Sequence, residues 1–105
     1  MYYIYMLRCE DNSIYTGITT KIERRMQEHF TQNEKCAKYT KYHKAIKLEA
    51  LWITEDRVHA SKLEYAIKHL KKEEKEELIS KKIELETLFI ERLECEKYKR
   101  TNPYF

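Results

Sequence analysis

The chain has 105 residues, of which 37% are charged, and its formal net charge at pH 7 is +3. Aromatic residues reach 12%, with nine tyrosines, which excludes a disordered chain because such chains lack side chains that bury apolar surface. A single glycine and a single proline exclude collagen-like, glycine-linker and proline-rich classes. The sequence therefore predicts one small globular domain.

The longest apolar segment, Met1–Leu7, is much shorter than the roughly 20 residues of a membrane-spanning helix, and Arg8 ends it. Neither a membrane span nor a cleaved signal peptide is expected. The three cysteines are odd in number and lack C-x-x-C spacing, which argues against a disulfide framework or a structural zinc site. We expect a reducing, cytoplasmic (intracellular) setting.

The first predicted element is a β-hairpin. Residues 2–7 are rich in aromatic and β-branched side chains, which suit a half-buried strand. The polar residues 10–13 favour a turn, and residues 14–16 return as an antiparallel strand that Gly17 ends.

A helix is predicted next, because Thr20 and Glu23 have the spacing of a capping box. Its buried stripe recurs every four residues, at Ile22, Met26 and Phe30. Residues 31–44 have no clean period and predict a basic loop with a short helical turn.

Residues 47–54 alternate and predict a third strand, with Leu48, Ala50 and Trp52 on one face. Thr54 and Asp56 are candidate caps of a second helix. That helix would bury Ala60, Leu63, Ile67 and Leu70. Apolar residues between 78 and 93 predict one or two further helices, and the tail from Thr101 through Pro103 is expected to fray. The order β-β-α-β-α-α predicts a small α/β (α+β) fold, in which helices flank a three-stranded antiparallel sheet.

The hairpin and the first helix hold the first candidate site residues. Tyr5 and Tyr15 would share one sheet face, although tyrosine is also an ordinary strand residue. Gly17, the only glycine, indicates either a structural turn with positive φ or a close approach to the backbone. Arg25 and His29 are four residues apart and share a helix face, which lies either toward the tyrosines or in solvent.

Glu64 lies at the edge of the second helix's apolar stripe, where a carboxylate needs a partner. A Mg²⁺ ion, or a salt bridge to Arg25 or to a lysine, would satisfy it. The segment 35–47 contains lysines and no acidic residue, and is either a solvated loop or a nucleic-acid contact. The candidate nucleic-acid-binding residues are Lys35, Lys38, Tyr39, Lys41, Tyr42 and Lys44. No Gly-rich phosphate loop, H-E-x-x-H or G-x-S-x-G motif is present, so no nucleotide cofactor is expected.

These motifs, in this order, resemble those of the GIY-YIG nuclease superfamily, and most of all its small, stand-alone members. Tyr3–Tyr5 matches the first motif and Tyr15–Gly17 the second, and the family arginine and glutamate fall on Arg25 and Glu64. His29 follows the arginine by four residues. The segments Ala37–Thr40 and Ile67–Ile79 also resemble small members of the family. Tyr3 stands where the family name has Gly, Thr16 where it has Ile, and no Asn follows the glutamate before Asn102. The resemblance covers residues 2–80, the expected nuclease domain, and leaves 81–105 as a C-terminal helical extension.

The resemblance implies metal-dependent hydrolysis of DNA phosphodiester bonds. Glu64 would hold one Mg²⁺ or Mn²⁺ ion, and Arg25 would bind the phosphate through its planar fork. Tyr5 would be the general base, Tyr15 would position water or phosphate, and His29 would assist the base or contact the phosphate.

Two functions are therefore weighed. The first is a structure-selective or single-strand-preferring DNA endonuclease of repair or recombination, with DNA as its partner. The alternative is a catalytically weak nucleic-acid-binding or adaptor module that retains the fold. Residues 83–93 are a candidate surface for a protein partner or for self-association, although packing on the chain's own domain explains their apolar stripe as well.

Overall fold

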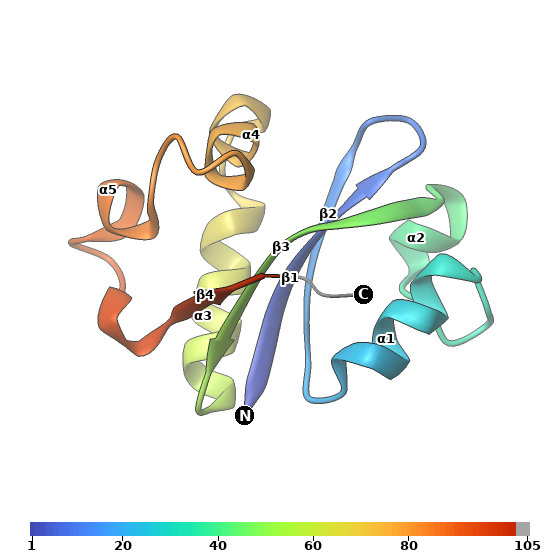
Figure 1. Cartoon of the computed structure of the whole chain (residues 1–105), viewed down its shortest axis with the longest axis horizontal. Helices are drawn as coiled ribbons and strands as arrows, with labels where there is room; N and C mark the ends of the chain where they lie inside the picture. The colour runs from blue at the N-terminus through green and yellow to red at the C-terminus, as the bar shows by residue number, and fades with distance from the viewer. Residues whose placement is uncertain (103–105) are drawn as a thin grey trace.

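The computed structural model describes residues 1–102, which form an α+β fold around one antiparallel sheet (Figure 1). The strands are β1 (Tyr2–Cys9), β2 (Ile14–Thr19), β3 (Ala45–Thr54) and β4 (Lys99–Thr101), in the spatial order β2-β1-β3-β4. The helices are α1 (Ile22–Phe30), α2 (Lys38–Tyr42), α3 (Arg57–Lys68), α4 (Lys72–Ile79) and α5 (Leu85–Phe89), with a 3₁₀ turn, η1, at Cys95–Lys97. Helix α3 begins at the predicted cap, since the Asp56 side chain accepts a hydrogen bond from the His59 N–H at 2.8 Å.

The sheet has four strands, not the predicted three. Strand β4 pairs antiparallel with β3, and Arg100 in its centre donates to the carbonyls of Leu78 and Ile79 at 2.6 and 2.9 Å. The Arg100 guanidinium also lies 5.0 Å from the ring centroid of Trp52. Contacts with distant residues therefore order Thr101, where fraying was expected, while Pro103 lies outside the described residues.

Helices cover both faces of the sheet (Figure 1). Helices α1 and α2 lie on one face, and α3, α4 and α5 on the other. Each face has its own buried cluster, the first centred on Tyr5, Met26 and Leu51 and the second on Met6 and Leu63. No helix within residues 1–102 is long and apolar enough to cross a membrane.

The C-terminal segment packs on the α3 face. Leu85 and Phe89 are buried there, and Ile83 and Leu93 pack against the same cluster. Only Ile90 of this stripe stays largely exposed, at 71%. The stripe therefore serves the chain's own core, which is the alternative that the sequence left open.

The predicted turn at Gly17 is wrong. Strand β2 continues past Gly17 to Thr19, and Gly17 pairs with Tyr5 in the middle of the hairpin. Its φ angle is not positive. A glycine inside a strand is unfavourable unless something needs the space of its missing side chain.

Two further local details differ from the sequence prediction. Helix α1 has no capping box, because its N-cap residue is Lys21 and the Lys21 side chain makes no capping hydrogen bond. Leu48 packs with Leu51 on the α1 face and not with Ala50, which lies on the α3 face. The pairing register shifts at Glu49, and such a bulge turns the following side chains to the opposite face.

Candidate active site

Tyr5 occupies the centre of the sheet and lies across Gly17. It is only 1% exposed and belongs to the cluster on the α1 face. A Cβ atom on Gly17 would lie 2.6 Å from Cζ of Tyr5 and closer still to the hydroxyl oxygen, and 3.0 Å from Cε2 of Tyr15. Real Cβ atoms essentially never approach so closely. The close approach of Tyr5, and not a turn, is therefore the reason for the single glycine.

The Tyr5 hydroxyl begins a buried chain of hydrogen bonds. It lies 2.8 Å from Nε2 of His29, and Nδ1 of the same ring lies 2.7 Å from Oγ1 of Thr40. The Thr40 hydroxyl lies 3.2 Å from the carbonyl oxygen of Ala37. His29 and Thr40 are both 0% exposed, so water does not compete for these bonds. The chain joins β1, α1 and α2.

Aromatic rings extend this chain into a continuous face. The ring centroid of Tyr15 lies 6.3 Å from that of Tyr5 and 5.5 Å from that of His29. Tyr15 also stacks on Tyr39, at 5.7 Å, and Tyr39 stacks on His43, at 4.2 Å. The structure thus brings Tyr39, from the basic segment, next to the tyrosines of the hairpin.

Burial sets the protonation of the Tyr5–His29 pair. It raises the pKa of Tyr5 far above its ordinary value, the neighbouring Tyr15 adds to this, and Arg25 opposes it. Burial first, and the positive charge of Arg25 second, lower the pKa of His29 to about 4. At neutral pH both rings are therefore uncharged, and the pair is one phenol next to one neutral imidazole.

Arg25 lies beside this pair with its guanidinium about one-quarter exposed (23%). Its Nη1 donates to Oε1 of Glu28 at 2.7 Å and to the carbonyl of Lys35 at 2.6 Å. Sequence reasoning missed Glu28, although its spacing of three residues from Arg25 on one helix was a visible signal. The ion pair and the carbonyl fix the guanidinium at the edge of the aromatic face.

Glu64 approaches from α3, and its side chain is 25% exposed. Its carboxylate lies 3.6 Å from Nζ of Lys68, so its partner is a lysine and not Arg25. Lys68 also lies over the Tyr15 ring, 5.4 Å from the centroid. Burial is the main cause of the raised pKa values of Tyr5 and Tyr15, and the negative charge of Glu64 adds to both. Glu64 is therefore close enough to act electrostatically on the two tyrosines.

The available ligand residues suit a Mg²⁺ or Mn²⁺ site that water and substrate complete better than a site in which the protein supplies every ligand. Among residues 1–102, no three His, Cys, Asp or Glu side chains gather as a metal cluster. Mg²⁺ usually keeps several waters and takes one or two carboxylates together with substrate phosphate. Glu64 fits this pattern, because it is a partly exposed carboxylate whose ion-pair partner among residues 1–102 is the exposed Lys68.

The remaining basic residues lie around the site and not in it. The side chains of Lys35, Lys38, Lys41 and Lys44 are exposed, and Tyr42 is 74% exposed. Helix α2 itself carries Lys38, Lys41 and Tyr42, and Thr40 is its buried residue. Lys35 precedes this helix and Lys44 follows it.

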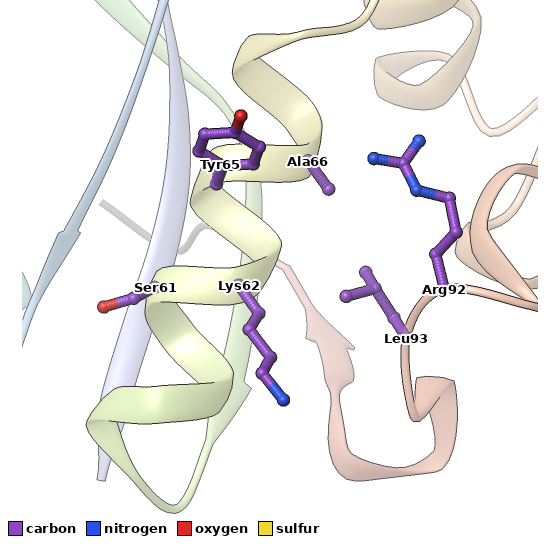
Figure 2. A pocket seen from close by; sticks show the side chains of 6 residues that line it. All are labelled: Ser61, Lys62, Tyr65, Ala66, Arg92 and Leu93. Carbon is purple, nitrogen blue, oxygen red and sulfur yellow. The ribbon is translucent and has the colours of Figure 1, made fainter.

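The one groove that Figure 2 shows lies elsewhere. It has a volume of about 390 Å³ and lies between α3 and the C-terminal segment. Its lining residues are Ser61, Lys62, Tyr65, Ala66, Arg92 and Leu93. None of the candidate site residues lines it, so the tyrosine site is not this groove.

Comparisons with known proteins agree with the tyrosine motifs. The sequence model of the GIY-YIG catalytic domain matches residues 1–78. A UPF0213 protein of Fusobacterium nucleatum is 49% identical over 80 residues, which are 76% of this chain and 78% of that protein. A UPF0213 protein of Clostridium perfringens is 41% identical over 83 residues, 78% of this chain and 86% of that protein. The solution NMR structure of the UPF0213 protein BH0048 from Bacillus halodurans has 41% identity and a TM-score of 0.51, and the match covers 78% of this chain and 86% of that one. Because the family match spans the hairpin, α1 and the α3 glutamate, this chain belongs to the GIY-YIG catalytic domain family.

Proposed function

We propose that the chain is a metal-dependent endonuclease that hydrolyses DNA phosphodiester bonds. The GIY-YIG family generally comprises nucleases that act on DNA with divalent metal ions. The observation that supports the proposal best is the buried Tyr5–His29 hydrogen bond, with Arg25 and Glu64 close to it. All of these residues lie within 2–80, which we propose as the catalytic unit, with 81–105 as its extension.

The proposed chemistry begins with a proton transfer. A water molecule that attacks phosphorus loses its proton to the Tyr5 oxygen, and Tyr5 passes its own proton to Nε2 of His29, while the P–O bond to the leaving strand breaks. The leaving oxygen takes a proton from solvent water, and the His29 imidazolium returns its proton to solvent. Tyr5 never has to exist as a free phenolate, which its raised pKa would make costly. A phosphate that pairs with Arg25 removes part of the charge that depresses the pKa of His29, so the base strengthens as substrate binds.

The other residues bind and orient the substrate. Arg25 presents its guanidinium fork to two phosphate oxygens, a geometry that lysine does not provide. Tyr15 positions the water or the phosphate from the neighbouring strand. A divalent ion held by Glu64 would supply a Lewis acid and neutralise phosphate charge.

A preference for single-stranded or structured DNA follows from the surface around the site. The exposed Tyr42 and the partly exposed Tyr39 offer faces on which unpaired bases stack, and the exposed lysines attract phosphate without reading sequence. Such a substrate would place the enzyme in DNA repair or recombination, in the cytoplasm.

A cleavage assay tests this proposal. Labelled single-stranded, duplex, flap and branched DNA are incubated with the full chain in Mg²⁺, Mn²⁺ or EDTA. Tyr5→Phe and Glu64→Gln are expected to lower the cleavage rate at least about 100-fold while DNA affinity is kept. The exposed Tyr65 gives a matched control, since Tyr65→Phe is expected to cleave at the wild-type rate.

Two results would overturn the proposal. Equal cleavage by wild type and both site variants would assign the activity to a contaminant or to another site. Binding without cleavage under any metal condition, weakened when Lys38 and Lys41 are changed to glutamine, would support the nucleic-acid-binding module instead.

A further inference from the structure

We propose that Thr40 is a positioning residue that holds His29 in the tautomer protonated at Nδ1, which leaves Nε2 free to accept the Tyr5 proton. The catalytic consequence rests on the proposed nuclease function, whereas the tautomer itself does not. The proposal adds α2, the short helix of the basic segment, to the architecture of the active site.

The argument starts from the single hydrogen of the Thr40 hydroxyl. The Ala37 carbonyl oxygen, 3.2 Å away, only accepts hydrogen bonds, so it takes this hydrogen whenever Nδ1 of His29 is itself protonated. Oγ1 of Thr40 then serves His29 as an acceptor, at 2.7 Å from Nδ1. A neutral imidazole carries one N–H, so protonation at Nδ1 makes Nε2 an acceptor.

The other tautomer leaves the buried Tyr5 hydroxyl hydrogen unsatisfied. If Nε2 carried the proton, it would donate to the Tyr5 oxygen, and the Tyr5 hydrogen would have no other acceptor in the described residues. The Thr40 hydroxyl would also have to turn toward Nδ1, which leaves the Ala37 carbonyl with the Lys41 N–H as its donor. A buried donor without a partner costs about 1–3 kcal/mol. With Nδ1 protonated, every donor and acceptor from Tyr5 to Ala37 is paired.

Burial makes this arrangement specific. His29 and Thr40 are 0% exposed, so water does not replace a lost partner. A hydrogen bond to one imidazole nitrogen decides the role of the other, which is how a residue that never touches substrate selects the active tautomer. Thr40 therefore acts through His29.

The tautomer is measured on the full chain by long-range ¹H–¹⁵N correlation spectra of the histidine rings at pH 7. His29→Gln assigns the His29 signals by their loss. We expect the wild-type spectrum to show a protonated Nδ1 and an unprotonated Nε2. In Thr40→Val, which has a similar shape but no acceptor, we expect the proton to move to Nε2 and the cleavage rate to fall about 10- to 100-fold, as for other partners that orient a histidine.

Two variants separate this role from folding. Thr40→Ser keeps the hydroxyl and is expected to restore the Nδ1–H tautomer and most of the cleavage rate. Thr16→Val is the matched control, because Thr16 is also buried, at 2% exposed, and its hydroxyl has no hydrogen-bond partner within residues 1–102. It is expected to leave both the spectrum and the rate unchanged.

The outcomes are distinct. A wild-type His29 protonated at Nε2, or a Thr40→Val protein that keeps both the Nδ1–H tautomer and full cleavage, would overturn the inference. If neither the wild type nor any variant cleaves DNA, but Thr40→Val still moves the His29 proton from Nδ1 to Nε2, the positioning role stands and the nuclease proposal fails.

Discussion

Adding one methyl group at Gly17 should destabilise the protein. An alanine Cβ would lie 2.6 Å from Cζ of Tyr5 and 3.0 Å from Cε2 of Tyr15, whereas carbon atoms pack at about 3.5–4.0 Å. The Tyr5 ring would have to retreat by roughly 1 Å within a close-packed core. Overpacking of this kind costs about 1–3 kcal/mol. Without the clash, Gly17→Ala would instead stabilise the strand by about 0.5–1 kcal/mol. The sign of the change in the free energy of unfolding therefore shows whether the clash exists.

Urea denaturation of Gly17→Ala measures this sign. The control is the same change in a Tyr5→Ala background, where the ring is absent and the methyl group should be neutral or mildly stabilising. A retreat of about 1 Å would also break the 2.8 Å bond between Tyr5 and His29, and a misplacement of that size lowers a rate about 100-fold. A Gly17→Ala protein as stable as wild type, or more stable, would refute the placement of Tyr5 on Gly17.

Three further changes test other parts of the molecule. Because the pKa of His29 is about 4 in the folded chain against 6.5 for an ordinary histidine, the unfolded chain takes up the proton first. The free energy of unfolding should therefore fall by about 3 kcal/mol as the pH drops from 6.5 to 4. In urea titrations, the free energy of unfolding of His29→Gln should depend much less on pH than that of the wild type. The control His69→Gln, at an exposed position, should show the wild-type pH dependence. Equal pH dependence for wild type and His29→Gln would contradict the lowered pKa of His29. Changing Lys38 and Lys41 to glutamine should reduce the slope of log affinity for single-stranded DNA against log salt by up to about 1.4, measured by fluorescence anisotropy, and an unchanged slope would exclude them from the interface. Arg8 bridges carboxylates of β3 and α4 at 2.6–3.1 Å, so Arg8→Met should cost about 3 kcal/mol in the same urea assay, and a loss below about 1 kcal/mol would show that the bridge is dispensable.

Features set by neighbouring residues could be predicted from the sequence. The hairpin followed from its aromatic strand and polar turn. Asp56 was a predictable cap of α3, because a capping side chain acts within three residues. The four-residue period of α1 placed Arg25 and His29 on one face. These signals are local, so they need no knowledge of the rest of the fold.

Features set by distant residues could not be predicted. Strand β4 exists because Arg100 reaches the end of α4 and the Trp52 ring, and three polar residues give no strand signal by themselves. The bulge at Glu49 likewise depends on the pairing of β3 with β1. The resemblance included the segment Ala37–Thr40 but assigned Thr40 no role, because the contact that matters is with a ring eleven residues earlier in the chain.

The candidate active site contains two residues in locally unfavourable settings. Gly17 lies within a strand, where glycine costs about 0.5–1 kcal/mol, and His29 is buried without charge at the expense of its basicity. Both costs serve Tyr5, because Gly17 makes room for its ring and His29 forms a hydrogen bond with its hydroxyl. If Tyr5 only filled the core, a phenylalanine with a larger neighbour than glycine would pack as well and need no buried partner. The hydroxyl is therefore the group that this arrangement serves, which is the strongest structural reason to look for chemistry at Tyr5.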